Sequence, residues 1–102
     1  EGLGFSDRIE HELRANDVAV IIAACKAVGF LGPAAKQLDT SVRAVIKHEN
    51  EGVRAAALRA IGSIGATGDL LEIVDGVEDQ MPEVQSAACL ALASAREQAK
   101  DS

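Results

Sequence analysis

The chain has 102 residues, enough for one domain, and 48% of them are hydrophobic against 25% charged. It can therefore bury a core, and its composition excludes an intrinsically disordered protein. A net charge of −6 and a pI near 4.8 argue against binding to a nucleic-acid backbone or an anionic membrane surface.

No segment is recognisable as a membrane span, a secretory signal or an arginine-rich transit peptide. The longest uninterrupted apolar run, 18–25, is far shorter than the ~20 residues that cross a bilayer. We therefore expect no membrane insertion, and a soluble protein inside a cell or an organelle is favoured over a secreted one. The chain begins with Glu1, which leaves two interpretations: a processed mature protein, or part of a longer one.

Six helices and no strands are expected. In chain order, first helices are predicted over 6–14, 33–48 and 68–79, and each precedes a second helix, over 20–32, 53–65 and 84–96. Short polar links join the members of each pair. Since the chain has no Trp or Tyr and only two Phe, its core must consist of small aliphatic side chains, and the helices must approach one another closely.

The three second helices repeat one pattern. They begin at Val20, Val53 and Val84, so the offsets are 53 − 20 = 33 and 84 − 53 = 31 residues. Repeats of this length form stacked supersecondary units that bury their apolar faces against their neighbours. The prediction is one domain over 1–102, with repeats at about 5–32, 33–65 and 66–96 and a frayed tail over 97–102.

Helical phase predicts which side of each second helix faces the core. In the middle copy the outward positions are Ala55, Arg59 and Gly62, and a left-handed glycine is expected to end the helix at Gly32 and Gly65. The predicted core positions are Val20, Ala23, Ala24, Ala27, Val28 and Leu31; Val53, Ala56, Ala57, Ala60, Ile61 and Ile64; Val84, Ala87, Ala88, Ala91, Leu92 and Ala95.

The segment from Asn50 to Gly65, with its Val53-Arg54 and the following alanines, resembles the repeat of HEAT proteins, in particular the short HEAT-like repeats of phycobilisome lyases. The third copy keeps Pro82-Glu83-Val84 but has Gln85 in place of the arginine, and the first has Ile21 there. The resemblance implies an all-α fold, an α-solenoid of three stacked two-helix repeats. It also implies a ladder of hydrogen bonds, in which an acidic residue of one repeat pairs with an arginine of a neighbouring repeat. We expect this ladder to be broken, because only the middle repeat keeps both members, as Asn50 and Arg54.

No cofactor, metal or catalytic site is predicted. His11 and His48 lie on different helices without a second ligand at metal-binding spacing, and no nucleophile has a recognisable base partner. Cys25 and Cys89 hold equivalent repeat positions about 20 Å apart, given helix spacings of ~10 Å. We therefore predict two unbridged thiols, both buried as small hydrophobes.

Some features have two interpretations. Gly29 and Gly62 hold matched positions, which favours close helix packing over approach to a ligand. An acidic stripe is either a solvated outer face or a docking site for a basic partner; it consists of Asp69, Glu72, Asp75, Glu78 and Asp79.

The first repeat is unusually apolar for an end unit. Four of its residues fall outside the predicted core arc: Val18, Ile21, Ile22 and Phe30. Either a partner or missing neighbouring repeats cover them, or the preceding helix wraps further around the second one.

The functional prediction is a non-catalytic scaffold or adaptor that binds another protein through its second helices. Their outward positions form the rows Ile22–Ala55–Ser86 and Lys26–Arg59–Leu90. The predicted partner-binding residues are Ile22, Lys26, Phe30, Arg59 and Leu90. The alternatives are a small accessory subunit of a large assembly and, from the resemblance to lyases, an enzyme that attaches or removes a linear tetrapyrrole.

Overall fold

The described part of the chain contains helices joined by turns and no strand, which confirms the predicted all-α class. The computed structural model describes the backbone of residues 2–64 and 71–100 and the side chains of 8–64 and 73–94. Its elements are α1 (Gly2–Leu13), α2 (Val18–Leu31), a 3-10 helix η1 (Gly32–Leu38), α3 (Asp39–Arg43), α4 (Glu51–Ile64), α5 (Leu71–Val77) and α6 (Pro82–Lys100). The helix α6 thus continues into the segment predicted as a tail, whereas the expected cap at Gly65 lies outside the described residues.

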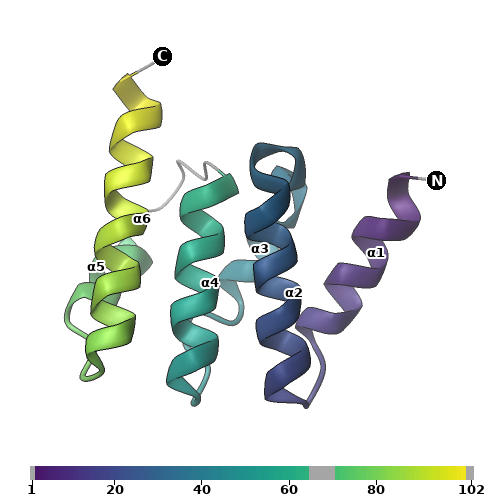
Figure 1. Cartoon of the computed structure of the whole chain (residues 1–102), viewed down its shortest axis with the longest axis horizontal. Helices are drawn as coiled ribbons and strands as arrows, with labels where there is room; N and C mark the ends of the chain where they lie inside the picture. The colour runs from purple at the N-terminus through teal and green to yellow at the C-terminus, as the bar shows by residue number, and fades with distance from the viewer. Residues whose placement is uncertain (1, 65–70, 101–102) are drawn as a thin grey trace.

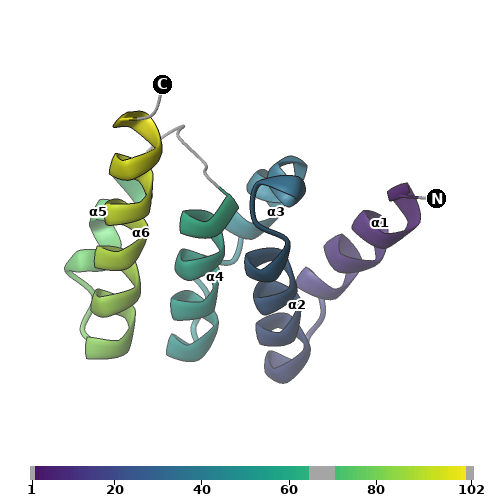
Figure 2. The ribbon, with the colours of Figure 1, turned by 45° about the horizontal axis from the view of Figure 1, so that its top comes forward.

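The helices form two layers. The second helices α2, α4 and α6 lie side by side, and α3 and α5 lie behind them (Figures 1 and 2). Helix α4 packs against both α2 and α6, while α1 packs against α2 at the N-terminal end. The middle second helix is therefore contacted on both flanks.

Polar side chains fix where the second helices begin. The Asp17 carboxylate accepts a hydrogen bond from the backbone N–H of Ala19 at 2.9 Å. The Asn50 side-chain oxygen accepts from the N–H of Gly52 at 2.8 Å and of Val53 at 3.2 Å. Both caps satisfy N–H groups that have no partner within the helix.

The first helix of the second repeat differs from the prediction. Instead of one helix over 33–48, the chain forms η1, then the five-residue α3, then turns over 44–47. The chain leaves α2 at Gly32, whose φ of 62° and ψ of −141° lie in a region that residues with a Cβ avoid. The predicted glycine at this helix end is therefore confirmed.

Most predicted core positions of α4 and α6 are buried, and the exceptions come from the packing of neighbouring helices. All six predicted core residues of α4 are buried, but so are Ala55 and Gly62, which were predicted to face outward. That part of the prediction is wrong because α6 covers the flank of α4 that carries them.

The buried arc of α2 is also shifted from the prediction. Ile21 is buried, and Val18 and Ile22 pack partly buried against the core, whereas Ala23 is exposed. Helix α1 packs against α2, and Ile22 lies beside Gly52 of α4, whereas Phe30 stays exposed. The apolar residues of the first repeat are therefore covered only in part. The described buried core of α2 is Ile21, Ala24, Cys25 and Val28.

Glycine allows α4 and α6 to approach closely. A Cβ built on Gly62 would lie 2.9 Å from the Cα of Ala91, closer than two carbon atoms can approach without displacement. At the matched position in α2, a Cβ on Gly29 would meet only ordinary contacts, at 3.7 Å and beyond. Close helix packing therefore explains the glycine at position 62, whereas the space at Gly29 would accept a Cβ.

One segment satisfies the length and hydropathy criteria for crossing a membrane. It is Val18–Arg43, which contains an 18-residue window of mean hydropathy 2.0. Within it, α2 ends after 14 residues and the chain turns at Gly32. A helix of that length spans about 21 Å, less than the ~30 Å hydrocarbon core of a bilayer, so the folded segment is not one membrane-length helix.

Candidate protein-interaction site

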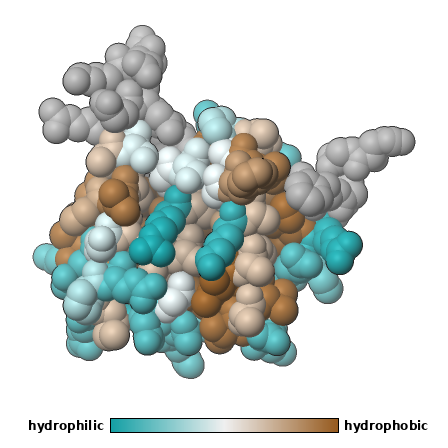
Figure 3. All heavy atoms as spheres, in the orientation of Figure 1, coloured by the Kyte–Doolittle hydropathy of each residue, from teal (hydrophilic) through white to brown (hydrophobic). Residues whose placement is uncertain are grey.

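Four of the five predicted partner-binding residues are exposed on the layer of second helices. Lys26 and Phe30 lie one turn apart on α2, Arg59 lies on α4 and Leu90 on α6. Phe30 is 91% exposed and Leu90 is 58% exposed. We call the surface defined by Lys26, Phe30, Arg59 and Leu90 the second-helix face; Figure 3 shows it with hydrophilic side chains in the middle and apolar surface on either side.

The fifth predicted residue is in a different environment. Ile22 is partly buried against the core, and its Cδ1 lies 3.3 Å from where a Cβ of Gly52 would be. The row Ile22–Ala55–Ser86 is not a surface row, because Ala55 is completely buried. The residues of the other predicted row, Lys26–Arg59–Leu90, are all exposed, and we call this row the open row.

Two neighbouring hollows lie along this open row. The first, between α2 and α4, has a volume of about 100 Å³, and the second, between α4 and α6, about 260 Å³. The lining residues of the first are Cys25, Lys26, Gly29, Ala56, Arg59, Ala60 and Ser63. Those of the second are Arg59, Gly62, Ser63, Leu90, Ala91 and Ser94. Arg59 and Ser63 line both hollows.

A second row of equivalent residues was not predicted from the sequence. Adding the repeat offsets to Phe30 gives Ser63 and Ser94, and these two serines line the hollows opposite Lys26, Arg59 and Leu90. The available signal was Gly29, which lines the first hollow and has no side chain to fill it. The two hollows therefore flank α4, one on each side of Arg59 and Ser63.

The second-helix face carries positive charge on an acidic protein. Within the described part of the chain, Lys26 and Arg59 are exposed and form no hydrogen bond or ion pair. Helix α2 contains no acidic residue. The acidic residues of α4 and of α6 over 82–94 are Glu51 and Glu83, both in first turns. The two cations are therefore available to an external anionic group.

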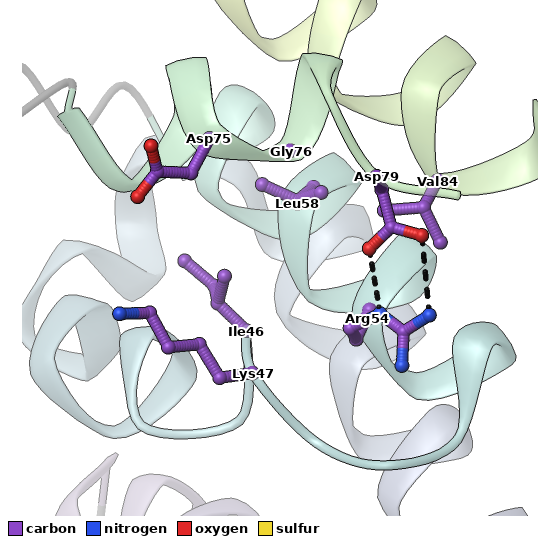
Figure 4. A pocket seen from close by; sticks show the side chains of 8 residues that line it. All are labelled: Ile46, Lys47, Arg54, Leu58, Asp75, Gly76, Asp79 and Val84. Atoms are coloured by element: carbon purple, nitrogen blue, oxygen red, sulfur yellow. Dashed lines mark hydrogen bonds and ion pairs between the residues drawn. The ribbon is translucent and has the colours of Figure 1, made fainter. Parts of the chain in front are cut away.

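On the opposite side of α4, Arg54 links two repeats. Its guanidinium donates to both carboxylate oxygens of Asp79, Nε to Oδ2 at 2.9 Å and Nη2 to Oδ1 at 3.2 Å, as Figure 4 shows. It also donates to the backbone carbonyls of His48 and Glu49 at 2.8 and 2.9 Å. One rung of the repeat-to-repeat ladder is therefore present, between Arg54 and Asp79. The equivalent positions of the other two repeats hold Ile21 and Gln85, so the ladder is not continuous.

The Arg54–Asp79 pair borders a hollow of about 220 Å³ between α4, α5 and the turns that follow α3 (Figure 4). Hydrogen bonds from Arg54, and one from the N–H of Met81 at 2.9 Å, hold the pKa of the Asp79 carboxyl below its usual value of 3.8. The lining residues are Ile46, Lys47, Arg54, Leu58, Asp75, Gly76, Asp79 and Val84.

The acidic stripe is only partly a free surface. Asp75 and Glu78 are exposed, whereas Asp79 is paired with Arg54. The predicted members Asp69 and Glu72 lie outside the described side chains. Asp79 therefore contributes to the joint between repeats.

The two cysteines are unbridged, as predicted, but their environments differ. Cys25 is buried and Cys89 is exposed, so the prediction that both are buried is wrong for Cys89. Burial raises the pKa of the Cys25 thiol to about 12. Helix α4 covers Cys25, whereas the equivalent side of α6 has no further described helix against it.

Neither histidine belongs to a metal-binding cluster. His11 is exposed, and the Nδ1 of His48 accepts a hydrogen bond from the N–H of Asn50 at 3.0 Å. Within the part of the chain that the structure describes, no three His, Cys, Asp or Glu residues are grouped to hold a metal ion.

A family model for HEAT repeats matches residues 6–93. With the two-helix repeats and the close approach of α4 and α6, this match shows that the chain belongs to the HEAT-repeat family. The match does not extend to the phycobilisome-lyase type. A comparison with curated proteins gives no match.

Proposed function

We propose that this chain is a non-catalytic protein-interaction module that binds its partner on the second-helix face. The observation that carries the proposal is the pair of unpartnered cations, Lys26 and Arg59, flanked by Phe30 and Leu90, the most exposed large apolar side chains of the described chain. Exposed aromatic residues next to arginine are the composition of an interface centre. HEAT repeats commonly serve as protein-interaction scaffolds, which is consistent with this role.

In this proposal the three repeats stack as an α-solenoid, whose second helices form the binding surface. Stacked repeats present long surfaces made from equivalent positions. The residues of the row Lys26–Arg59–Leu90 hold one such position, and those of the row Phe30–Ser63–Ser94 hold the position one helical turn further along each helix. The runner-up is a permanent accessory subunit of a larger assembly, in which the same face is always covered.

The lyase alternative receives less support. The hollows described above are about 100 to 260 Å³ in volume, at or below the lower end of the usual range for small-molecule sites of ~300–1,000 Å³. A linear tetrapyrrole added to the protein would change its absorbance on binding. We expect no such change.

The proposal is tested by quantitative affinity capture with matched variants. Phe30→Asp and Leu90→Asp change the second-helix face, and Val74→Asp, at a residue 45% exposed on α5, adds the same charge elsewhere. A partner bound on the face should be lost with both face variants and retained by Val74→Asp. Partners that depend equally on all three positions, or on none, would contradict the proposal. Circular dichroism checks that every variant is folded.

A further inference from the structure

We propose that the second-helix face binds an extended, acidic segment of the partner protein in the polyproline II conformation. The segment has carboxylates at residues i and i+3 and an apolar side chain at residue i+6. This inference rests on the proposed function and specifies the chemistry and geometry of the bound segment. It follows from charge, from repeat spacing and from the two hollows.

Charge selects an acidic segment. Lys26 and Arg59 have no counter-ion in the described chain, and the protein as a whole has a charge of −6. A basic or neutral segment would leave both cations unpaired, whereas two carboxylates would each form a charge-assisted hydrogen bond. The third residue of the row is Leu90, so we expect the bound segment to place an apolar side chain against it.

Spacing selects the conformation. Lys26, Arg59 and Leu90 hold equivalent positions on three adjacent helices, whose axes are ~8–10 Å apart when packed. In a polyproline II helix, residues i and i+3 lie on the same side, ~9.3 Å apart. A β-strand places i and i+3 on opposite sides. A segment that crosses the three helices in the polyproline II conformation therefore presents one side chain in register to each residue of the row.

The hollows give the segment space beside the row. One lies on each side of α4, and Arg59 and Ser63 line both. Gly29 leaves room for a backbone to approach, since a Cβ there would meet no atom closer than 3.7 Å. The serine hydroxyls can donate to backbone carbonyls of the segment, which have no internal partners in the polyproline II conformation.

The test uses labelled peptides and fluorescence anisotropy. The matched peptide has glutamates three residues apart, a leucine three residues later and proline between them, since proline fixes the extended backbone. The first comparison peptide has the same composition but places the glutamates two residues apart. The second is an alanine-rich helical peptide with glutamates seven residues apart, which gives a similar spacing on one helix face.

We expect the matched peptide to bind about tenfold or more tightly than either comparison peptide, and its affinity to fall with added salt. The double change Lys26→Glu with Arg59→Glu should weaken its binding about tenfold or more. The control, Arg8→Glu with Arg14→Glu, causes the same change in net charge at two exposed arginines, one in α1 and one directly after it, and should alter binding by less than about twofold.

Several results would overturn the inference: no binding of the matched peptide at millimolar concentration, equal affinity for the peptide with the wrong spacing, or preference for the helical peptide. Equal binding of a single-stranded oligonucleotide would assign the face to a nucleic acid. A dimer that only the Lys26/Arg59 variant dissociates would assign it to a second copy. If Phe30→Asp still removes a captured partner while the peptides fail, the proposed function stands and only the polyproline II segment is excluded.

Discussion

Arg54 on α4 holds both carboxylate oxygens of Asp79, a residue 25 positions further along the chain. Both side chains are mostly buried, 19% and 16% exposed. Asp79 also accepts from the N–H of Met81 just before α6, and Arg54 also donates to the chain just before α4. The pair therefore joins the start of one second helix to the start of the next.

Removing Arg54 should destabilise the protein markedly. Arg54→Ala leaves the Asp79 carboxylate and two carbonyls without their donor, at an expected cost of about 2–3 kcal/mol in the free energy of unfolding. The measurement is urea unfolding followed by circular dichroism. The control is Arg14→Ala, which removes an exposed ion pair to Glu10 and should cost less than ~0.5 kcal/mol. Equal effects would mean that the Arg54–Asp79 pair does not join the repeats.

The same pair should make stability depend on pH at the acid end. Because the pKa of Asp79 is lowered in the folded state from 3.8, its contribution is fully present well above that value and is lost as the pH falls through the folded-state pKa. We expect the difference in unfolding free energy between wild type and Asp79→Asn to be constant from pH 7 to about 5 and to shrink below about pH 4. Asp75→Asn, at an exposed carboxylate, is the control. A difference that does not change with pH would contradict the assignment.

The matched glycines should respond oppositely to alanine. Gly62→Ala places a Cβ 2.9 Å from the Cα of Ala91, and the forced displacement should cost about 1–3 kcal/mol. Gly29→Ala meets no atom closer than 3.7 Å and gains up to ~1 kcal/mol of helix propensity. Thermal unfolding of both variants distinguishes them. If Gly62→Ala is as stable as wild type, α4 and α6 are not in close backbone contact.

The two thiols should differ in reactivity. The raised pKa of Cys25, about 12, and its burial disfavour the thiolate that attacks alkylating reagents, whereas Cys89 is exposed. In native buffer at pH 8 we expect iodoacetamide to modify Cys89 within minutes, and Cys25 only after denaturant is added. Mass spectrometry of the digested protein locates the label. Rapid labelling of Cys25 in the native protein would show that α2 is not covered as described.

The periodic pattern by itself determined the helical fold and the buried side of α4, and the resemblance of residues 50–65 to HEAT repeats indicated the family. Val53, Ala57 and Ile61 recur at helical spacing, and a stripe of that kind has one low-energy outcome, which is burial against another helix. Lys26, Arg59 and Leu90 were predicted as an exposed row for the same reason. Local sequence was sufficient at these positions because the repeat period and the helix phase fix the direction of each side chain.

Only the tertiary structure decided how wide each buried face is. Cys25 and Cys89 hold the same repeat position, yet one is buried and the other exposed, because α4 packs beside α2 while no described helix packs on the equivalent side of α6. The Arg54–Asp79 pair likewise joins residues of different repeats. Helical phase gives the direction of a side chain, whereas burial depends on which neighbour lies in that direction, and that neighbour comes from a distant part of the chain.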